Sequence, residues 1–79
     1  MRLLDEDRDT KLDRVTIYLT RPEAEELMSD LRMALANPKG HHAHISSEDF
    51  QKEITVCIYD NNLLGDFNER SKRLIKDDV

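Results

Sequence analysis

One short stretch, residues 53–59, constrains the fold of this 79-residue chain more than any other. Apolar and semi-polar side chains alternate along it in the order Ile54, Thr55, Val56, Cys57, Ile58 and Tyr59. Successive side chains of a strand point to opposite faces, and β-branched residues are common in strands. The stretch therefore predicts a strand with one apolar face, which other parts of a short chain must cover.

A second strand and a helix are predicted directly before the middle of the chain. Residues 14–19 also alternate, with the apolar side chains on one face: Val15, Ile17 and Leu19. Thr20 then stands three residues before Glu23, which is the capping-box pattern, and Pro22 suits a first helical turn. We therefore expect a half-buried strand over residues 14–19 and a helix that begins at Arg21 or Pro22.

The helix pattern continues at spacings of three and four residues, which places one apolar stripe on the helix: Ala24, Leu27, Met28, Leu31 and Leu35. Met33 falls on the opposite side. Pro38 and Gly40 then predict the end of the helix and a turn. A second stripe predicts a helix that ends near Lys76: Leu63, Leu64, Phe67, Ser71, Leu74 and Ile75.

The expected elements follow one another in the order β-α-β-β-α, which is an α+β fold. A helix between the first two strands favours a parallel connection, and the short link that follows favours an antiparallel hairpin. With the most apolar strand central, we expect a two-layer sandwich, with a three-stranded sheet of order 1-3-2 and both helices on one face. We expect one domain over residues 1–79, with a charged lead-in over 1–12 and a frayed tail over 77–79. A short strand at Arg2 to Leu4 is the alternative for the lead-in.

All three histidines of the chain lie between positions 41 and 44. If Ala43 and Ile45 face the helices, the period of two sends His42 and His44 to the other face and leaves His41 on the helix side. When Ile45 pairs with Ile54, Ala43 lies opposite Val56, His44 opposite Thr55 and His42 opposite Cys57. A shift of two residues keeps the faces and changes the partners.

The link between these two strands is expected to contain a helical turn through Glu48-Asp49-Phe50 that Ser46 or Ser47 caps. Phe50, at its end, is expected to point toward the core. His44 beside the two serines also allows a nucleophile and base, but neighbours on a strand point apart. Cys57 is a second candidate nucleophile. We rank catalysis last and expect a protein that is not an enzyme.

The open face of the predicted sheet is the candidate functional surface. It carries semi-polar side chains that tolerate both water and burial, and it suits a protein partner or a homodimer. The candidate partner-binding residues are Tyr18, His42, His44, Cys57 and Tyr59. The first expectation is therefore a non-enzymatic protein-binding domain.

A metal site is the alternative from a different class. His42 and His44 can converge on one ion, and Cys57 can supply a thiolate across the ladder. Zinc prefers three or four such ligands, and Tyr59 is a poor fourth. Apart from this zinc alternative, we expect no cofactor.

Charge and cysteine content narrow the partners and the compartment. The chain has 12 Lys and Arg against 17 Asp and Glu, a formal charge of −5. This charge repels nucleic acid on average and favours a basic protein partner. Cys57 is the only cysteine, which favours a reducing compartment, and no apolar run approaches a membrane span or a signal peptide. We expect a cytoplasmic protein that binds neither nucleic acid nor membrane.

Residues 19–27, followed by Gly40-His41-His42-Ala43-His44 and by the strand at residues 54–59, resemble a known group of proteins. They resemble the small immunity-type proteins of bacterial polymorphic toxin systems, the immunity protein 32-like group among them. The resemblance covers residues 15–60. It implies a small acidic cytosolic protein that binds and blocks a toxin or another effector, and it carries over Gly40, His42 and His44.

Overall fold

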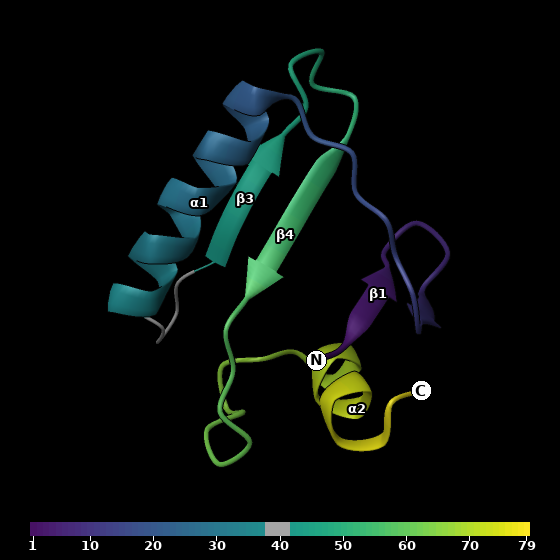
Figure 1. Cartoon of the computed structure of the whole chain (residues 1–79). Coiled ribbons are helices and arrows are strands. Elements are labelled where there is room, and N and C mark those ends of the chain that lie inside the picture. The colour runs from purple at the N-terminus through teal and green to yellow at the C-terminus, as the bar shows by residue number, and fades with distance from the viewer. Residues whose placement is uncertain (38–41) are drawn as a thin grey trace. The chain divides into compact units, whose positions relative to one another are not determined.

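The structure is a computed structural model that describes residues 1–37 and 42–79. The described residues form four strands and two helices, so the chain is α+β as expected (Figure 1). They divide into two compact units: residues 18–59, and residues 1–17 together with 60–79. Each unit is described by itself below.

The unit of residues 18–59 contains helix α1 (Arg21–Ala36), strand β3 (His42–Ser46) and strand β4 (Glu53–Cys57). Helix α1 begins where the sequence predicts. The side chain of Thr20 accepts a hydrogen bond from the backbone N–H of Glu23 at 3.3 Å, and Glu23 Oε1 accepts one from the N–H of Thr20 at 2.9 Å. These two bonds satisfy amides that a helix N-terminus otherwise leaves without partners. The predicted capping box is therefore confirmed.

Strands β3 and β4 form an antiparallel hairpin in the predicted register. Ile45 pairs with Ile54, and the ladder continues to the pair of His42 and Cys57. Helix α1 packs along β3 (Figure 1), where Ala43 and Ile45 are buried. The predicted assignment of the two faces of β3 is confirmed. His41 and the predicted turn at Pro38 to Gly40 lie outside the described residues.

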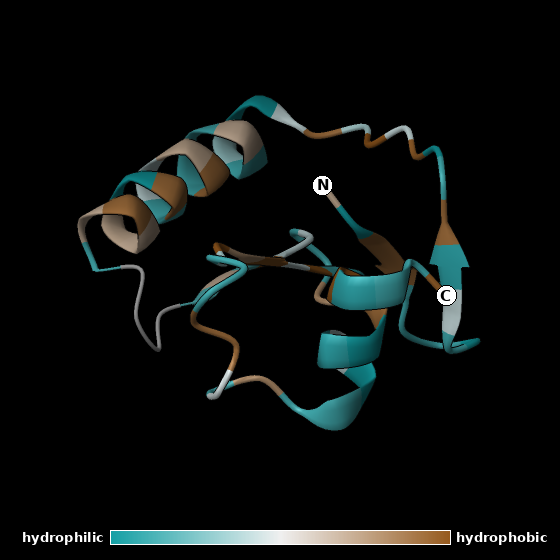
Figure 2. Cartoon of the chain, turned by 90° about the horizontal axis from the view of Figure 1, so that it is seen from below, coloured by the Kyte–Doolittle hydropathy of each residue, from teal (hydrophilic) through white to brown (hydrophobic). Residues whose placement is uncertain are grey.

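The stripe predicted for α1 is only partly correct. Leu27 and Leu31 are half-buried, but Ala24, Met28 and Leu35 are exposed, and the fully buried residue of the helix is Ala34, which the predicted stripe does not include. A helix that packs along a single strand makes a narrow contact, so the residues at the edges of its apolar stripe reach solvent. Met33 is exposed, as predicted. Figure 2 shows hydrophobic and hydrophilic residues intermingled around α1.

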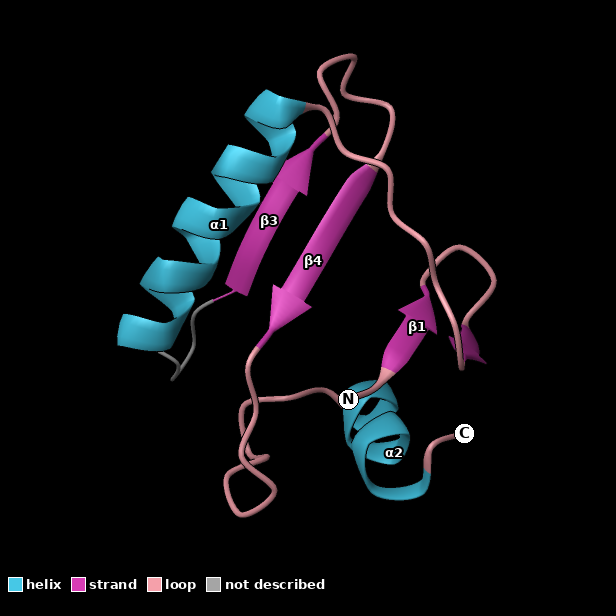
Figure 3. Ribbon diagram, viewed as in Figure 1, coloured by secondary structure: helices cyan, strands magenta, loops and turns pink. Residues whose placement is uncertain are grey.

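The strand predicted over residues 14–19 is not part of a sheet among the described residues (Figure 3). The described strands form two two-stranded antiparallel sheets, and a three-stranded sheet of order 1-3-2 is not what the structure shows. Val15 and Ile17 are about half exposed. An alternating pattern favours strand geometry but specifies no neighbour with which to pair, so the pattern alone could not fix the sheet.

The unit of residues 1–17 and 60–79 contains the second hairpin, β1 (Leu3–Asp5) and β2 (Thr10–Leu12). The alternative of a short strand near Arg2 to Leu4 is therefore the one observed, in place of a solvated lead-in. The Asp5 carboxylate accepts hydrogen bonds from the backbone N–H groups of Asp7 and Arg8, and Asp9 takes a left-handed φ of 52°. These features close a turn that charge composition alone did not predict.

Helix α2 (Glu69–Asp77) lies in the same unit and is largely hydrophilic (Figure 2). Asn68 caps its start by accepting the N–H of Ser71 at 2.8 Å, so the helix begins later than the predicted stripe. Its core residues are Leu74 and Ile75. Asp78 caps its end in the left-handed conformation, and its backbone N–H donates to the carbonyl of Leu74 at 2.9 Å.

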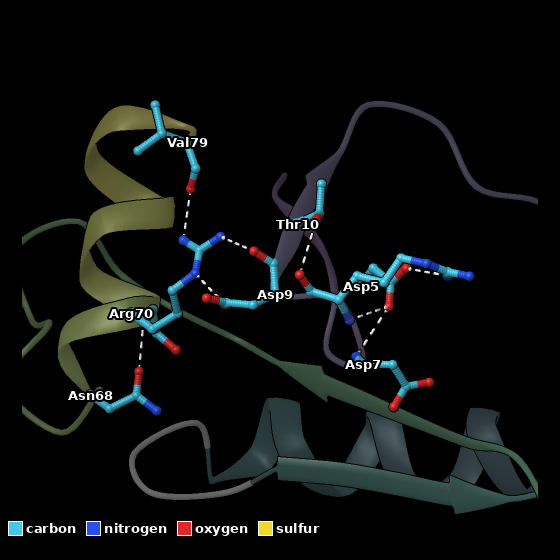
Figure 4. Close-up of polar contacts among 9 residues, drawn as sticks. Asp5, Asp7, Asp9, Thr10, Asn68, Arg70 and Val79 are labelled. Atoms are coloured by element: carbon cyan, nitrogen blue, oxygen red, sulfur yellow. Dashed lines mark hydrogen bonds and ion pairs between the residues drawn. The ribbon is translucent and has the colours of Figure 1, made fainter.

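Arg70 anchors both the hairpin turn and the last residue of this unit. Its Nε lies 2.6 Å from a carboxylate oxygen of Asp9, and its Nη1 donates to the backbone carbonyl of Val79 at 2.7 Å (Figure 4). The Arg70 side chain is 19% exposed but the Asp9 side chain is 65% exposed, so water still screens this ion pair. The contact holds two segments together that lie 61 residues apart in the sequence.

Candidate functional site

The exposed face of the β3–β4 hairpin places the predicted histidines beside residues of the neighbouring strand. We call it the His–Cys face and define it by His42, His44, Thr55 and Cys57. The two-residue period of β3 turns both histidines away from α1, and the ladder places Cys57 and Thr55 opposite them. Two of the five predicted partner-binding residues, Tyr18 and Tyr59, are outside this set.

His42 and Cys57 are in direct contact. The imidazole Nδ1 lies 2.9 Å from the Cys57 sulfur, and both residues are exposed. The tautomer of His42 sets the direction of this bond: the thiol donates to a bare Nδ1, and an Nδ1–H donates to the sulfur of the thiol or of the thiolate. The predicted register therefore brings a nucleophilic sulfur and a base together.

His44 has different neighbours. Its Nδ1 lies 3.0 Å from the Thr55 hydroxyl and 3.3 Å from a carboxylate oxygen of Glu53. The side chains of His44 and Glu53 are more than half exposed, so their attraction is screened by water and exists as an ion pair only when His44 is protonated. These contacts orient the second imidazole independently of Cys57.

The two histidine rings are neighbours on the same face. Their centroids are 5.9 Å apart, and the ring planes are tilted by 48°. This spacing is within the range at which aromatic pairs attract each other. Cross-strand hydrogen bonds at both rings therefore give the His–Cys face an ordered arrangement of semi-polar groups.

The predicted zinc ligands are not arranged as a metal site. Among residues 1–37 and 42–79, no group of three or more His, Cys, Asp and Glu side chains is placed to hold a metal ion. His42 and Cys57 are in contact, but the Nδ1 of His44 is directed to Thr55 and Glu53. The described residues thus bring two of the three predicted ligands together.

The two tyrosines are not placed as the sequence predicts. Tyr18 is 90% exposed, but it precedes α1 and lies in no strand. Tyr59 is half-buried and lies two residues beyond the end of β4. The prediction that Tyr18 shares a sheet face with the histidines depended on the strand over residues 14–19, which the structure does not show.

Glu23 is the residue that sequence reasoning undervalued. Its Oε1 completes the capping box, and its Oε2 accepts a hydrogen bond from the backbone N–H of Glu48 at 2.9 Å. The backbone N–H groups of Thr20 and Glu48 hold the pKa of the Glu23 carboxyl below its ordinary value, and the bond from Thr20 has the larger effect. The capping pattern predicts the first bond, but no sequence signal indicates the second, because Glu48 lies 25 residues away.

The turn that Glu23 contacts is organised by Ser47. Its hydroxyl donates to the Asp49 carboxylate and accepts from the backbone N–H groups of Gln51 and Lys52. The predicted helical turn over residues 48–50 is not observed: Ser47 organises a non-helical turn, because its hydroxyl bonds the amides of Gln51 and Lys52 at the far end of the loop. The expectation that Phe50 points toward the core is wrong: Phe50 is 85% exposed and has a left-handed φ of 59°. The hydrogen-bonded turn, and not burial of the ring, determines its conformation.

Comparisons with protein-family models, with curated proteins and with solved structures found no match to this chain. The resemblance to the immunity protein 32-like group therefore stays a prediction. Of the residues it carries over, His42 and His44 lie on the His–Cys face, and Gly40 lies outside the described residues. Among the described residues, no helix is long and apolar enough to cross a bilayer.

Proposed function

We propose that this chain is a non-enzymatic protein-binding domain that contacts its partner through the His–Cys face. The observation that carries the proposal is the exposed pair of histidines, each hydrogen-bonded to a side chain of the neighbouring strand. A surface whose side chains are already oriented loses less conformational entropy on binding. Imidazole, hydroxyl and thiol groups also combine apolar contact with hydrogen bonding, and protein interfaces contain both kinds of contact.

The charge of the chain supports a basic partner. At −5 the chain attracts cationic surfaces and repels polyanions. Glu53, which contacts His44, adds an acidic group at the rim of the His–Cys face. Together with the family resemblance, the charge supports a more specific proposal. The chain is a small cytoplasmic immunity-type or inhibitor-type protein that binds and blocks a toxin or another effector. A second copy of the chain is the other occupant to be tested.

The test begins with affinity capture by the purified chain, followed by a direct binding measurement with the captured protein. The double variant His42→Ala/His44→Ala removes both rings, and Met33→Ala is the matched control, since Met33 is an exposed residue of α1. We expect the control to bind its partner like the unaltered chain and the double variant to bind at least about ten-fold more weakly. Equal affinities for all three would overturn the proposal.

Native mass spectrometry distinguishes the two occupants. If the unaltered chain and the Met33→Ala control are dimers and the double variant is a monomer, the His–Cys face binds a second copy of the chain. A monomer mass for all three chains excludes the homodimer and leaves a heterologous partner. Circular dichroism must first show that the double variant keeps its helix and strand content.

A further inference from the structure

The pair of His42 and Cys57 combines a sulfur nucleophile with a base in a fixed geometry. The two residues are partners in the β3–β4 ladder, and their side-chain atoms Nδ1 and Sγ are 2.9 Å apart. Both are exposed, so a small reagent can reach the sulfur. A sulfur with an imidazole beside it has chemistry that does not require an active-site pocket.

We propose that His42 makes Cys57 a modification site at which small disulfide compounds attach by thiol–disulfide exchange. The thiolate is the form of cysteine that attacks disulfides. An adjacent imidazole accepts the thiol proton, and the resulting imidazolium stabilises the thiolate by a charge-assisted hydrogen bond. Because the ladder holds the two atoms together, little ordering is needed before the proton moves.

The exchange step balances with a disulfide as the oxidant. The Cys57 thiolate attacks one sulfur of the disulfide, a new S–S bond forms to Cys57, and the original S–S bond breaks. The leaving thiolate takes the proton that His42 had accepted, so the products are a mixed disulfide on Cys57 and one small thiol. The disulfide is reduced as Cys57 is oxidised.

The charged and titratable groups around the pair define its neighbourhood. On the same face, the His44 ring is 5.9 Å from the His42 ring, and Glu53 contacts His44. On the opposite face of β3, Ala43 and Ile45 are buried where α1 packs. His44 is thus a natural comparison residue: an imidazole on the same strand and face whose Nδ1 contacts Thr55 and Glu53.

The test measures two rates on the folded, reduced chain between about pH 5 and pH 10. The first is formation of the mixed disulfide with oxidised glutathione, followed by intact mass, and the second is alkylation by iodoacetamide. Near neutral pH we expect His42→Ala to slow both reactions by about five-fold, and we expect the two profiles to converge above about pH 9, where thiols ionise without help. His44→Ala should stay within about two-fold of the unaltered chain.

Two further measurements keep the test decisive. Cys57→Ser must abolish formation of the mixed disulfide, and a glutathione adduct that remains on this variant would contradict the assignment of the site. The unaltered chain unfolded in urea loses the pair, so it should react with the pH profile of an ordinary thiol even if His42→Ala does not fold. Identical profiles for the folded and the unfolded chain, or for the unaltered chain and a folded His42→Ala variant, would overturn the proposal.

Discussion

The carboxylate of Glu23, in the first turn of α1, accepts a hydrogen bond from the backbone N–H of Glu48, in the turn between β3 and β4. The same carboxylate accepts the N–H of Thr20, so one side chain satisfies a donor at the helix start and a donor in the turn. Glu23 is 9% exposed, which makes both bonds costly to lose. These two hydrogen bonds of Glu23 hold the turn between β3 and β4 against the start of α1. The same hairpin carries the His–Cys face.

Replacing Glu23 with Gln should lower the melting temperature by several degrees. The amide keeps one acceptor oxygen but presents an N–H₂ group to the second backbone donor, so one of the two N–H groups loses its partner. Thermal unfolding followed by circular dichroism measures the effect. Glu25→Gln is the control, since Glu25 is an exposed residue of the same helix that pairs with Arg21. Equal losses in both variants would contradict the role of Glu23.

The same carboxylate predicts how stability depends on pH. The backbone N–H groups of Thr20 and Glu48 lower its pKa below the ordinary 4.5, so between the two values the unfolded chain binds more protons than the folded one. The contribution is complete above pH 4.5 and is lost as the pH falls through the folded pKa. Hydrogen bonds from Arg8 and Ser47 lower the pKa of Asp5 and Asp49 in the same direction.

The urea concentration at the midpoint of unfolding should therefore decrease as the pH is lowered from about 6 to about 3. The decrease should be smaller for Glu23→Gln. The slope for that variant does not vanish, since Asp5 and Asp49 still titrate. A midpoint that rises on acidification, or a variant with the full slope of the unaltered chain, contradicts the assignment.

Replacing Phe50 with Gly should stabilise the chain by about 0.5 to 1 kcal/mol. The left-handed φ of 59° is strained for an aromatic residue but not for glycine, and an 85% exposed ring contributes little burial. Urea unfolding measures the change. Phe50→Ala removes the ring and keeps the strained Cβ, so it should show no such gain. A glycine variant that is less stable than the alanine variant would refute this explanation.

The local features of the sequence predicted the local features of the structure. Thr20 and Glu23 are three residues apart, so their capping box depends only on neighbours in the chain. The register that pairs His42 with Cys57 follows from aligning the apolar faces of two strands joined by a short turn. These predictions succeed because the period of two leaves few alternatives over five ladder pairs.

The predictions that were wrong concern features that depend on partners distant in the sequence or on backbone hydrogen bonds. The alternation over residues 14–19 favours a strand, but it does not determine which strand lies beside it. The sequence predicts Phe50 at the end of a helical turn and toward the core, whereas the Ser47 hydroxyl and the backbone of the turn determine its position. The bond from Glu48 to Glu23 has no sequence pattern at all.

Trimming one methyl group from each of two paired isoleucines tests where the core lies. Ile45 is 3% exposed and Ile54, its ladder partner, is half-buried. We expect Ile45→Val to cost about 0.5 to 1.5 kcal/mol and Ile54→Val to cost less, because the second site leaves a smaller cavity. Urea unfolding of both variants gives the comparison. The opposite order of the two costs is incompatible with the contact between α1 and β3.

The central claim is that a partner binds the His–Cys face. The most direct measurement adds the partner recovered by affinity capture to the ¹⁵N-labelled chain and records which backbone amide signals shift. The account predicts that the largest shifts fall at residues 42–46 and 53–57, the two strands of the β3–β4 hairpin. Shifts confined to the exposed side of α1 or to β1 and β2 would contradict it.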